Sequence, residues 1–380
     1  MKKNVCLLGS SGSVGVQALS VCKDLNFKVC AIVANENIKL LEEQARMFNV
    51  PLVCVNNEKH YKKLKDSLSD TFSKVVAGKE GILKVCRTYC DLVLNAIVGI
   101  SGFLPTVFAL ENKKNVALAN KESLVVGGKL ILDLAKKNFC KILPVDSEHS
   151  AIFQCIGEEN IKNVSKIFLT ASGGPFFGKS RDFLKTVTVK DALKHPNWNM
   201  GKKITIDSAT MMNKGLELIE AVNLFEKNTK EIEIVVHRQS VLHSAVEFID
   251  GSILGQFGVP DMRLAIQYAL TYPKRNFSNL EKFSFFKYSN LNFSKPDYET
   301  FPCLKYCKEA IEKGGLFPTV VNAANEKAVE LFLKEDINFL DIEKAVEKAL
   351  KIKHINNKLT IDSILETDIY VKKHVESFFN

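Results

Sequence analysis

Two carboxylates, Asp146 and Glu148, stand at a place where chemistry is common in α/β proteins. They follow an apolar segment at residues 140–145 and precede a helix-like run, so both should lie where a strand ends. In open α/β proteins, ligands bind at that edge of the sheet. Carboxylates there can also cap the following helix, because they offset its positive dipole end. These two residues alone leave both interpretations open.

The stretch at residues 207–225 adds a third carboxylate beside a set of hydrogen-bond donors. Ser208, Asn213 and Lys214 offer a hydroxyl, an amide and an ammonium group near a helix start, which suits a phosphate. Glu217 lies one turn further on, among apolar neighbours, and could still be a surface glutamate. If it points toward the two earlier acids, the three charges need a cation, and hard oxygen ligands select Mg²⁺ or Mn²⁺.

A glycine-rich loop, Gly9-Ser-Ser-Gly12-Ser-Val-Gly15, follows an apolar strand at residues 4–8 and precedes an amphipathic helix at residues 16–25. Glycines here let backbone amides approach a pyrophosphate, and the helix N-terminus adds positive potential. The spacing G-x-x-G-x-x-G is less specific than G-x-G-x-x-G, so an ordinary glycine-rich turn is the alternative. The strand before the loop and the helix after it favour a dinucleotide site.

Polar residues also follow two other expected strands. Asn35-Glu36-Asn37 follows the second strand. At this place an acidic residue favours NAD by bonding the ribose 2′-hydroxyl, and a basic residue favours the 2′-phosphate of NADP. This segment does not clearly favour either cofactor. Lys121 follows the strand that ends at residue 119, at the same sheet edge as Asp146. It could be an ordinary surface lysine exposed to solvent. Its position between the expected dinucleotide site and the carboxylates favours contact with a polar ligand instead.

Two loops in the middle of the chain could close around a ligand. Residues 170–176 are mostly small and could hold a phosphate through Ser172 and exposed amides, or could form only a turn. Residues 177–201 show little periodicity and include His195 and Trp198, the only tryptophan. A long loop of this kind favours a lid over a ligand, although the tryptophan could instead pack the loop against the core.

The pattern of expected elements predicts an α/β fold with three domains. Strand and helix alternate through residues 1–145, which implies parallel strands with right-handed crossovers and a Rossmann-like domain. A central α+β catalytic domain follows at residues 146–273, with its lid at about residues 177–201. Residues 274–301 are rich in Ser, Asn, Lys and Phe and are expected to form a linker, and residues 302–380 a C-terminal α-helical domain.

The expected elements of the first domain are short. Strands are expected at residues 4–8, 28–34, 52–55, 74–77, 91–98, 115–119 and 140–145. Helices are expected between them, at residues 16–25, 38–48, 59–69, 80–89, 105–111 and 124–137.

The rest of the chain mixes short strands with helices. After a helix at residues 151–155 and a strand at 166–169, strands at 232–236, 244–249 and 253–257 should form an antiparallel sheet. Asp250-Gly251 between the last two strands is a strong hairpin signal. Further helices are expected at residues 261–270, 304–313, 318–333, 342–352 and 360–379.

Composition narrows the class of protein. The chain has 380 residues, 46% hydrophobic and 25% charged, as in a globular protein with a sizeable core. Lys and Arg outnumber Asp and Glu by 52 to 43, but the excess is scattered, which predicts no nucleic-acid partner and weakly favours an anionic, phosphorylated substrate. Several of the ten cysteines lie in apolar runs, as in reduced cytosolic proteins, and no run approaches a membrane span. We therefore expect a cytoplasmic protein with no membrane partner.

With these motifs together, the chain resembles the 1-deoxy-D-xylulose 5-phosphate reductoisomerase family along nearly its whole length. The motifs that carry the resemblance are GSSGSVG at Gly9, AIVG at Ala96, ANKESLV at Ala119, LPVDSEH at Leu143, SGGPF at Ser172, HPNWNMG at His195, DSATMMNKGLE at Asp207 and GVPDMR at Gly258. The family rearranges and reduces 1-deoxy-D-xylulose 5-phosphate to 2-C-methyl-D-erythritol 4-phosphate in the non-mevalonate route to isoprenoids. The resemblance implies NADPH and Mg²⁺ or Mn²⁺ as cofactors, with Co²⁺ as an alternative, a small phosphorylated ketose as substrate, and a homodimer.

The resemblance also implies roles for individual residues. The implied metal ligands are Asp146, Glu148 and Glu217, which with Lys121 are the implied catalytic residues. The implied substrate contacts are Ser147, Ser172, His195, Trp198, Ser208, Asn213 and Lys214, with Trp198 and Met200 on the closing lid. The implied cofactor contacts are Ser11, Gly12, Ser13, Val14, Asn35, Asn37, Asn120, Glu122, Gly201 and Met262.

The sequence departs from the family at two places. Family members often carry a basic residue where this chain has Glu36, so we expect NADPH with weaker discrimination against NADH. Arg238 stands where the family usually has proline, and the sequence provides no account of it.

Two other functions remain open. The chain could be another NADP-linked oxidoreductase of a phosphorylated or amino-acid-derived carbonyl, without the rearrangement. It could also be a non-catalytic NADP-binding sensor or assembly protein, although such a protein would have little reason to keep the three acids.

Overall fold

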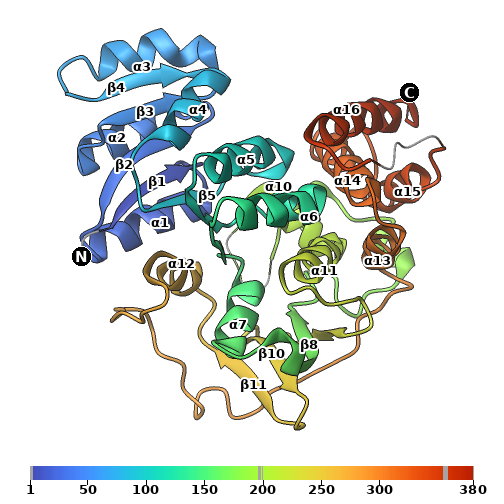
Figure 1. The fold of residues 1–380 in the computed structure, drawn as a ribbon. Coiled ribbons are helices and arrows are strands. Elements are labelled where there is room, and N and C mark those ends of the chain that lie inside the picture. Colours follow the sequence, from blue (N-terminus) through green and yellow to red (C-terminus); the bar gives the residue numbers. More distant parts are fainter. Residues whose placement is uncertain (1–2, 196–197, 199, 354–357, 380) are drawn as a thin grey trace. The chain divides into compact units, whose positions relative to one another are not determined.

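The computed structural model describes residues 3–195, 198, 200–353 and 358–379 (Figure 1). The chain divides into two compact units. The first comprises Met1–Ser123, Ile131–Ser150 and Asp261–Leu280, and the second comprises Leu124–Leu130, Ala151–Pro260 and Glu281–Asn380. The three predicted domains and their linker stay a prediction.

A seven-stranded parallel sheet forms the core of the first unit, in the order β4-β3-β2-β1-β5-β6-β7. Its strands are β1 (Asn4–Leu8), β2 (Lys28–Ala34), β3 (Leu52–Val55), β4 (Lys74–Ala77), β5 (Leu92–Asn95), β6 (Asn115–Leu118) and β7 (Ile142–Pro144). The interior strands β3 and β5 are buried along their whole length, as expected for a parallel sheet covered on both faces. The predicted α/β fold with a Rossmann-like sheet is confirmed.

The strand order reverses at β1. The chain builds outward from β1 through β2 and β3 to β4, and then returns to the other side of β1 with β5 before continuing to β6 and β7. Ligands of open α/β sheets bind beyond the carboxyl ends of the strands at such a reversal. The glycine loop after β1, Lys121 after β6 and Asp146 after β7 all follow carboxyl ends of this sheet.

The helices of this sheet differ from the prediction mainly at their starts. They are α1 (Ser13–Asp24), α2 (Ile38–Phe48), η1 (Glu58–His60), α3 (Tyr61–Ser67), α4 (Gly78–Arg87), η2 (Gly99–Gly102), α5 (Phe103–Glu111), α6 (Lys121–Lys137), α7 (Ser147–Ile156) and α12 (Met262–Thr271). Helix α6 begins three residues before the prediction, because the Asn120 side chain caps it, and Gly128 kinks it with φ 38° and ψ −121°. Helix α7 was predicted from residue 151 and begins at Ser147, so Glu148 belongs to its first turn.

The second unit contains a four-stranded mixed sheet in the order β11-β10-β8-β9. Its strands are β8 (Val164–Ala171), β9 (Ile232–Val236), β10 (Leu242–Phe248) and β11 (Ile253–Phe257). The predicted hairpin of β10 and β11 is confirmed, but the prediction that β9 joins an antiparallel sheet is wrong, since β9 pairs with β8 in parallel. The long helical connection between β8 and β9 allows a crossover, and no short turn requires them to run antiparallel.

Helices make up most of the remaining second unit. They are η3 (Ile161–Asn163), α8 (Arg181–Leu184), α9 (Val189–Ala192), α10 (Lys202–Ala209), α11 (Met212–Leu224), α13 (Cys303–Lys313), α14 (Phe317–Leu333), α15 (Phe339–Ala349) and α16 (Ile361–Ser377). The expected lid therefore contains two short helices, α8 and α9, which its weak periodicity did not predict. Helix α14 is the centre of the C-terminal helices and packs on α13, α15 and α16 (Figure 1). Among the described residues, no helix combines the length and apolarity that crossing a membrane requires.

Candidate active site

The glycine loop after β1 is held tightly enough to exclude side chains. Gly9 has φ +85°, and the amides of Gly9 and Ser10 both donate to the carbonyl of Val33. A Cβ on Gly15 would lie 2.1 Å from the carbonyl oxygen of Gly9, which no real side chain could accept. Helix α1 follows with Gly12 as its N-cap residue, which has no side chain to cover the first amides. The loop therefore has the local structure of an anion site at a helix N-terminus.

The segment after β2 is exposed and already hydrogen-bonded to the next strand end. The side-chain Nδ2 of Asn56 donates to Asn35 Oδ1 at 2.9 Å, and the side-chain Nδ2 of Asn57 donates to Glu36 Oε1 at 2.9 Å. The side chain of Asn37 caps α2 by accepting from the amide of Leu40 at 3.2 Å.

Asn120 organises a buried polar cluster at the carboxyl ends of β5 and β6. Its Nδ2 donates to the carbonyls of Ile97 and Gly99 and to Glu122 Oε2, at 2.6, 2.8 and 3.0 Å. Its Oδ1 accepts from the amide of Ser123. Asn120 and Glu122 are only 2% and 6% exposed, so their polar groups are hydrogen-bonded to protein groups and not to solvent.

Lys121 and Asp146 form an ion pair of 2.6 Å across the ends of β6 and β7, with side chains 7% and 11% exposed. Nδ1 of the buried His149, one turn into α7, lies 3.8 Å from Asp146 Oδ2. Ser147 Oγ donates to Glu148 Oε2 at 2.5 Å. The structure thus brings a lysine, two carboxylates and a serine to one sheet edge. Sequence reasoning did not single out His149, although it follows Asp146 by only three residues and lies in the first turn of the helix that Asp146 precedes.

Glu217 is 1% exposed and is therefore not a surface glutamate. Asn213 Nδ2 donates to its Oε1 at 2.5 Å, and Lys214, which is 4% exposed, forms an ion pair with Oε2. All three residues lie on α11, where spacings of three and four residues put them on one face. A buried carboxylate of this kind keeps its charge only because charged and polar donors surround it.

Ser172, His195 and Ser208 lie together in the second unit. Ser172 Oγ is 3.1 Å from His195 Nε2, and the Gly174 amide donates to Ser172 Oγ at 3.3 Å. A Cβ on Gly174 would lie 2.4 Å from the Ser208 carbonyl oxygen, so the loop after β8 packs directly on α10. His195 Nδ1 accepts from the Trp198 amide at 3.0 Å, so a neutral His195 carries its proton on Nε2 and donates it to Ser172.

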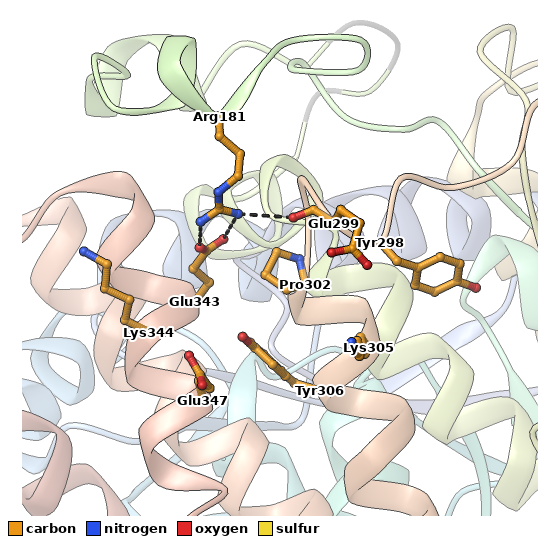
Figure 2. A pocket seen from close by; sticks show the side chains of 9 residues that line it. All are labelled: Arg181, Tyr298, Glu299, Pro302, Lys305, Tyr306, Glu343, Lys344 and Glu347. Carbon is orange, nitrogen blue, oxygen red and sulfur yellow. Dashed lines mark hydrogen bonds and ion pairs between the residues drawn. The ribbon is translucent and has the colours of Figure 1, made fainter.

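The first turn of the expected lid is attached to the C-terminal helices. Figure 2 shows Arg181 of α8 extending toward Glu343 of α15, with which it forms an ion pair, while its Nη1 also donates to the Glu299 carbonyl at 3.3 Å. Beside this pair, the buried Phe176 packs edge-on against Phe339 with ring centroids 5.3 Å apart. The ion pair lies at a cavity of about 400 Å³ lined by Arg181, Tyr298, Glu299, Pro302, Lys305, Tyr306, Glu343, Lys344 and Glu347.

The structure assembles the predicted residues in two sets. One set comprises Asn120, Lys121, Glu122, Asp146, Ser147 and Glu148. The other, in the second unit, comprises two groups: Ser172, His195, Trp198 and Ser208 around the loop after β8, and Asn213, Lys214 and Glu217 on α11. Gly201 is the N-cap residue of α10, and Met262 is the first residue of α12. The shared site of Asp146, Glu148 and Glu217 stays a prediction, as do the ligand contacts of all these residues.

Comparisons with known proteins place this chain in a family. Three family models match it: 1-deoxy-D-xylulose 5-phosphate reductoisomerase at residues 5–128, the C-terminal domain of that enzyme at residues 142–225, and the DXP reductoisomerase C-terminal domain at residues 257–374. The 1-deoxy-D-xylulose 5-phosphate reductoisomerase of Acetivibrio thermocellus is 52% identical, covering 99% of each chain. A Bacillus anthracis relative of that name, numbered 1, is 47% identical, covering 98% of each chain.

Solved structures agree with these matches. The enzyme from Zymomonas mobilis in complex with NADPH has a TM-score of 0.94 and 41% identity, covering 100% of both chains. A DOX-P reductoisomerase in complex with NADPH, fosmidomycin and magnesium has a TM-score of 0.95 and 37% identity, covering 99% of this chain and 98% of the other. The chain therefore belongs to the 1-deoxy-D-xylulose 5-phosphate reductoisomerase family.

Proposed function

We propose that the buried polar residues of this chain act together in the reaction of its family. The chain is an oxidoreductase that rearranges 1-deoxy-D-xylulose 5-phosphate and reduces the product to 2-C-methyl-D-erythritol 4-phosphate, with NADPH and a divalent metal ion. The observation that carries the site is the Lys121–Asp146 pair, buried beyond the carboxyl edge of a Rossmann-like sheet. In this fold that edge is where cofactor and substrate meet.

We assign the pyrophosphate of NADPH to Ser11, Gly12, Ser13 and Val14. The fit rests on the glycine loop, which has no space for a Cβ at Gly9 or Gly15 and presents the start of α1. Asn35 and Asn37 are assigned to the adenosine end, where hydroxyls and backbone amides must do more because Glu36 replaces a base. The nicotinamide end is assigned to Asn120, Glu122, Gly201 and Met262.

We assign the metal ion to Asp146, Glu148 and Glu217. Their carboxylate oxygens are the hard donors that Mg²⁺ and Mn²⁺ prefer, and each is buried or partly buried, where negative charge needs compensation. When bound, the ion supplies Lewis-acid stabilisation of negative charge that develops on the substrate's oxygens. Lys121 and Ser147 are then placed to orient the carbonyl and hydroxyl groups of the substrate.

The substrate's phosphate is assigned to Ser172, His195, Ser208, Asn213 and Lys214. Hydroxyl, imidazole, amide and ammonium donors suit a dianion, and the first three of these residues already lie together. Binding a phosphate away from the reacting carbons provides energy that can be expressed in the transition state. We assign Trp198 to a lid that closes over the substrate and excludes water from the aldehyde intermediate.

We further propose a cytoplasmic homodimer. All ten cysteines, each among the described residues, are free thiols, which supports a reducing compartment. Strand β11 is the edge of its sheet and exposes Ile253 and Leu254, which are 55% and 52% accessible. An exposed apolar edge strand is suited to covering by a second copy of the chain.

The test is NADPH oxidation with 1-deoxy-D-xylulose 5-phosphate, with and without Mn²⁺ and a chelator, followed by product analysis. We expect turnover that requires the metal and yields branched 2-C-methyl-D-erythritol 4-phosphate. Oxidation that yields an unbranched product would instead identify an NADP-linked reductase without the rearrangement.

A further inference from the structure

We propose that Arg238 is a positioning residue that braces the loop of Ser172, Gly173 and Gly174 so that it can receive the substrate's phosphate. This inference rests on the proposed phosphate role of Ser172. Arg238 lies two residues beyond the end of β9, outside the stretches to which the site was assigned. Its Nη1 donates to the carbonyl oxygens of both Ser172 and Gly174, each at 2.6 Å.

The bond to the Ser172 carbonyl fixes the direction of the next amide. The peptide unit between Ser172 and Gly173 is planar and trans, so its N–H points away from the side on which its carbonyl lies. By binding that carbonyl, Arg238 directs the Gly173 N–H to the opposite face of the loop. On its other side, the loop is closed by the Gly174 amide, which donates to Ser172 Oγ.

This loop needs a brace because its glycines are conformationally free. Gly173 and Gly174 have φ +76° and +68°, and a Cβ on Gly173 would lie 2.9 Å from Phe177 Cδ2. Glycine loses more backbone entropy on ordering than any other residue. A glycine loop without external contacts would become ordered only when the ligand binds, and the entropy lost then would weaken binding. Contacts that order it in advance improve affinity by removing that cost.

Arg238 is itself held in place. Its guanidinium carbon lies 5.2 Å from the ring centre of Phe177, the first residue of the expected lid. The preceding residue, His237, is fully buried, and its Nδ1 is 3.0 Å from the carbonyl oxygen of Asn292. One side chain therefore connects the small loop, the start of the lid and the end of β9.

The chemistry of the guanidinium suits this position. Burial lowers the pKa of Arg238 from its ordinary value, but guanidinium groups stay protonated in proteins, so the positive charge remains. Two carbonyl acceptors offset part of the cost of that burial, and a fixed positive charge behind the loop favours a dianionic ligand. Both bonds come from Nη1, whose two N–H groups have fixed directions in the guanidinium plane, whereas the freely rotating ammonium of a lysine would reach less far and hold the two carbonyls less rigidly.

The experiment uses the full-length enzyme with NADPH and Mg²⁺ and compares Arg238→Met, Arg238→Lys and Arg87→Met. Arg87→Met is the control for lost charge, since Arg87 is exposed at the end of α4. The readouts are KM for both substrates, kcat, the inhibition constant of inorganic phosphate and the thermal unfolding midpoint. Trp198, the only tryptophan, gives a fluorescence signal for phosphate binding that does not depend on turnover.

We expect Arg238→Met to raise KM for the sugar phosphate and the phosphate inhibition constant by about tenfold, the usual effect of losing bonds from a charged donor. KM for NADPH should stay within about twofold. In Arg238→Lys, the KM for the sugar phosphate and the phosphate inhibition constant should rise about threefold, and Arg87→Met should match the wild type.

A folded Arg238→Met variant with unchanged phosphate affinity would overturn the inference. If that variant does not fold, unchanged phosphate affinity in Arg238→Lys overturns it instead. If the wild type forms no product, the proposed function is wrong. If the wild type is active and the Arg238 variants are equally active, only the role of Arg238 is wrong.

Discussion

Glu217 is nearly inaccessible to solvent, and donors from its own helix hold its carboxylate. Lys214 and Asn213 both reach it from the preceding turn. A charge buried in this way is retained at a cost, which is common where a protein needs the charge for binding or catalysis. The exposed Asn35 and Asn37 carry no such cost, and the cofactor contacts that we propose for them would be hydrogen bonds made in competition with water.

We predict that Glu217→Gln slows turnover by about two orders of magnitude or more and weakens metal dependence, because it removes the charge of a proposed metal ligand without changing side-chain shape. NADPH affinity should change by less than about twofold, since this residue is not among the cofactor contacts. Rates measured against Mn²⁺ concentration, with NADPH binding measured separately, check this prediction. The matched control is Glu309→Gln, which removes a carboxylate from an exposed pair with Lys313 and should leave turnover unchanged. Equal turnover in both variants would show that Glu217 is no ligand.

Buried thiols should be unreactive in the native protein. Burial raises the pKa of Cys22, Cys54 and Cys86, each to about 12, which leaves almost no thiolate at pH 8. Only Cys140 and Cys155 of the ten cysteines are not fully buried. We predict that a thiol reagent at pH 8 labels these two first and labels all ten after unfolding in guanidinium. Mass spectrometry of the labelled peptides gives the result, and rapid native labelling of Cys54 would contradict it.

At the scale of elements, α15 holds the chain around the start of the expected lid through a polar and an apolar contact. Glu343 and Phe339, four residues apart on one face of the helix, contact Arg181 and Phe176. Burial raises the pKa of Glu343, and the nearby Arg181 opposes that shift without cancelling it. On the same helix, hydrogen bonding with Lys351 lowers the pKa of Glu347.

These two glutamates should give opposite contributions to the pH dependence of stability. The folded state binds the Glu343 proton more tightly than the unfolded state does, so its contribution to the free energy of unfolding falls as pH rises from the ordinary glutamate pKa through the raised folded value. Glu347 contributes stability above its unfolded pKa and loses it as pH falls through the lowered folded value. In the wild type, Glu343 should make the free energy of unfolding fall as pH rises, and we predict that Glu343→Gln abolishes this fall. Glu347 should make it fall by a smaller amount as pH falls, and we predict that Glu347→Gln abolishes that effect. Urea unfolding between about pH 3 and pH 7 measures both slopes, and slopes of the same sign would contradict the assignment.

At the scale of the whole molecule, β11 is an edge strand of the second sheet with two exposed apolar side chains, Ile253 and Leu254. Leu254 lies on β11, which pairs with β10 on one side only. If the proposed dimer forms through this edge, Leu254→Lys should convert it to a monomer, because a lysine on an edge strand opposes further strand pairing. Sedimentation velocity gives the mass, and Ile369→Lys, at an exposed position on α16, serves as the control. An unchanged dimer in Leu254→Lys would place the interface elsewhere.

The elements that the sequence predicted best are those with a continuous local signal. The bounds of β2, β3, β4, β9 and β11 agree with their apolar runs, and α2 agrees with its periodicity and its Asn37 cap. Helix starts were less accurate, because a cap such as Asn120 acts through its own hydrogen bonds and not through hydrophobic spacing. The short helices α8 and α9 were missed for a similar reason, since four residues carry too little periodicity to recognise.

Residue types and motif order determined the chemistry that Asp146, Glu148 and Glu217 offer, because those properties are local to the chain. Only the tertiary structure decided that β9 pairs in parallel with β8, that Glu217 is buried, and what Arg238 does. Each of these depends on a partner distant in sequence: Arg238 is 66 residues from Ser172, whose carbonyl it binds. Local sequence patterns show both residues, but they do not show that the fold brings the two into contact.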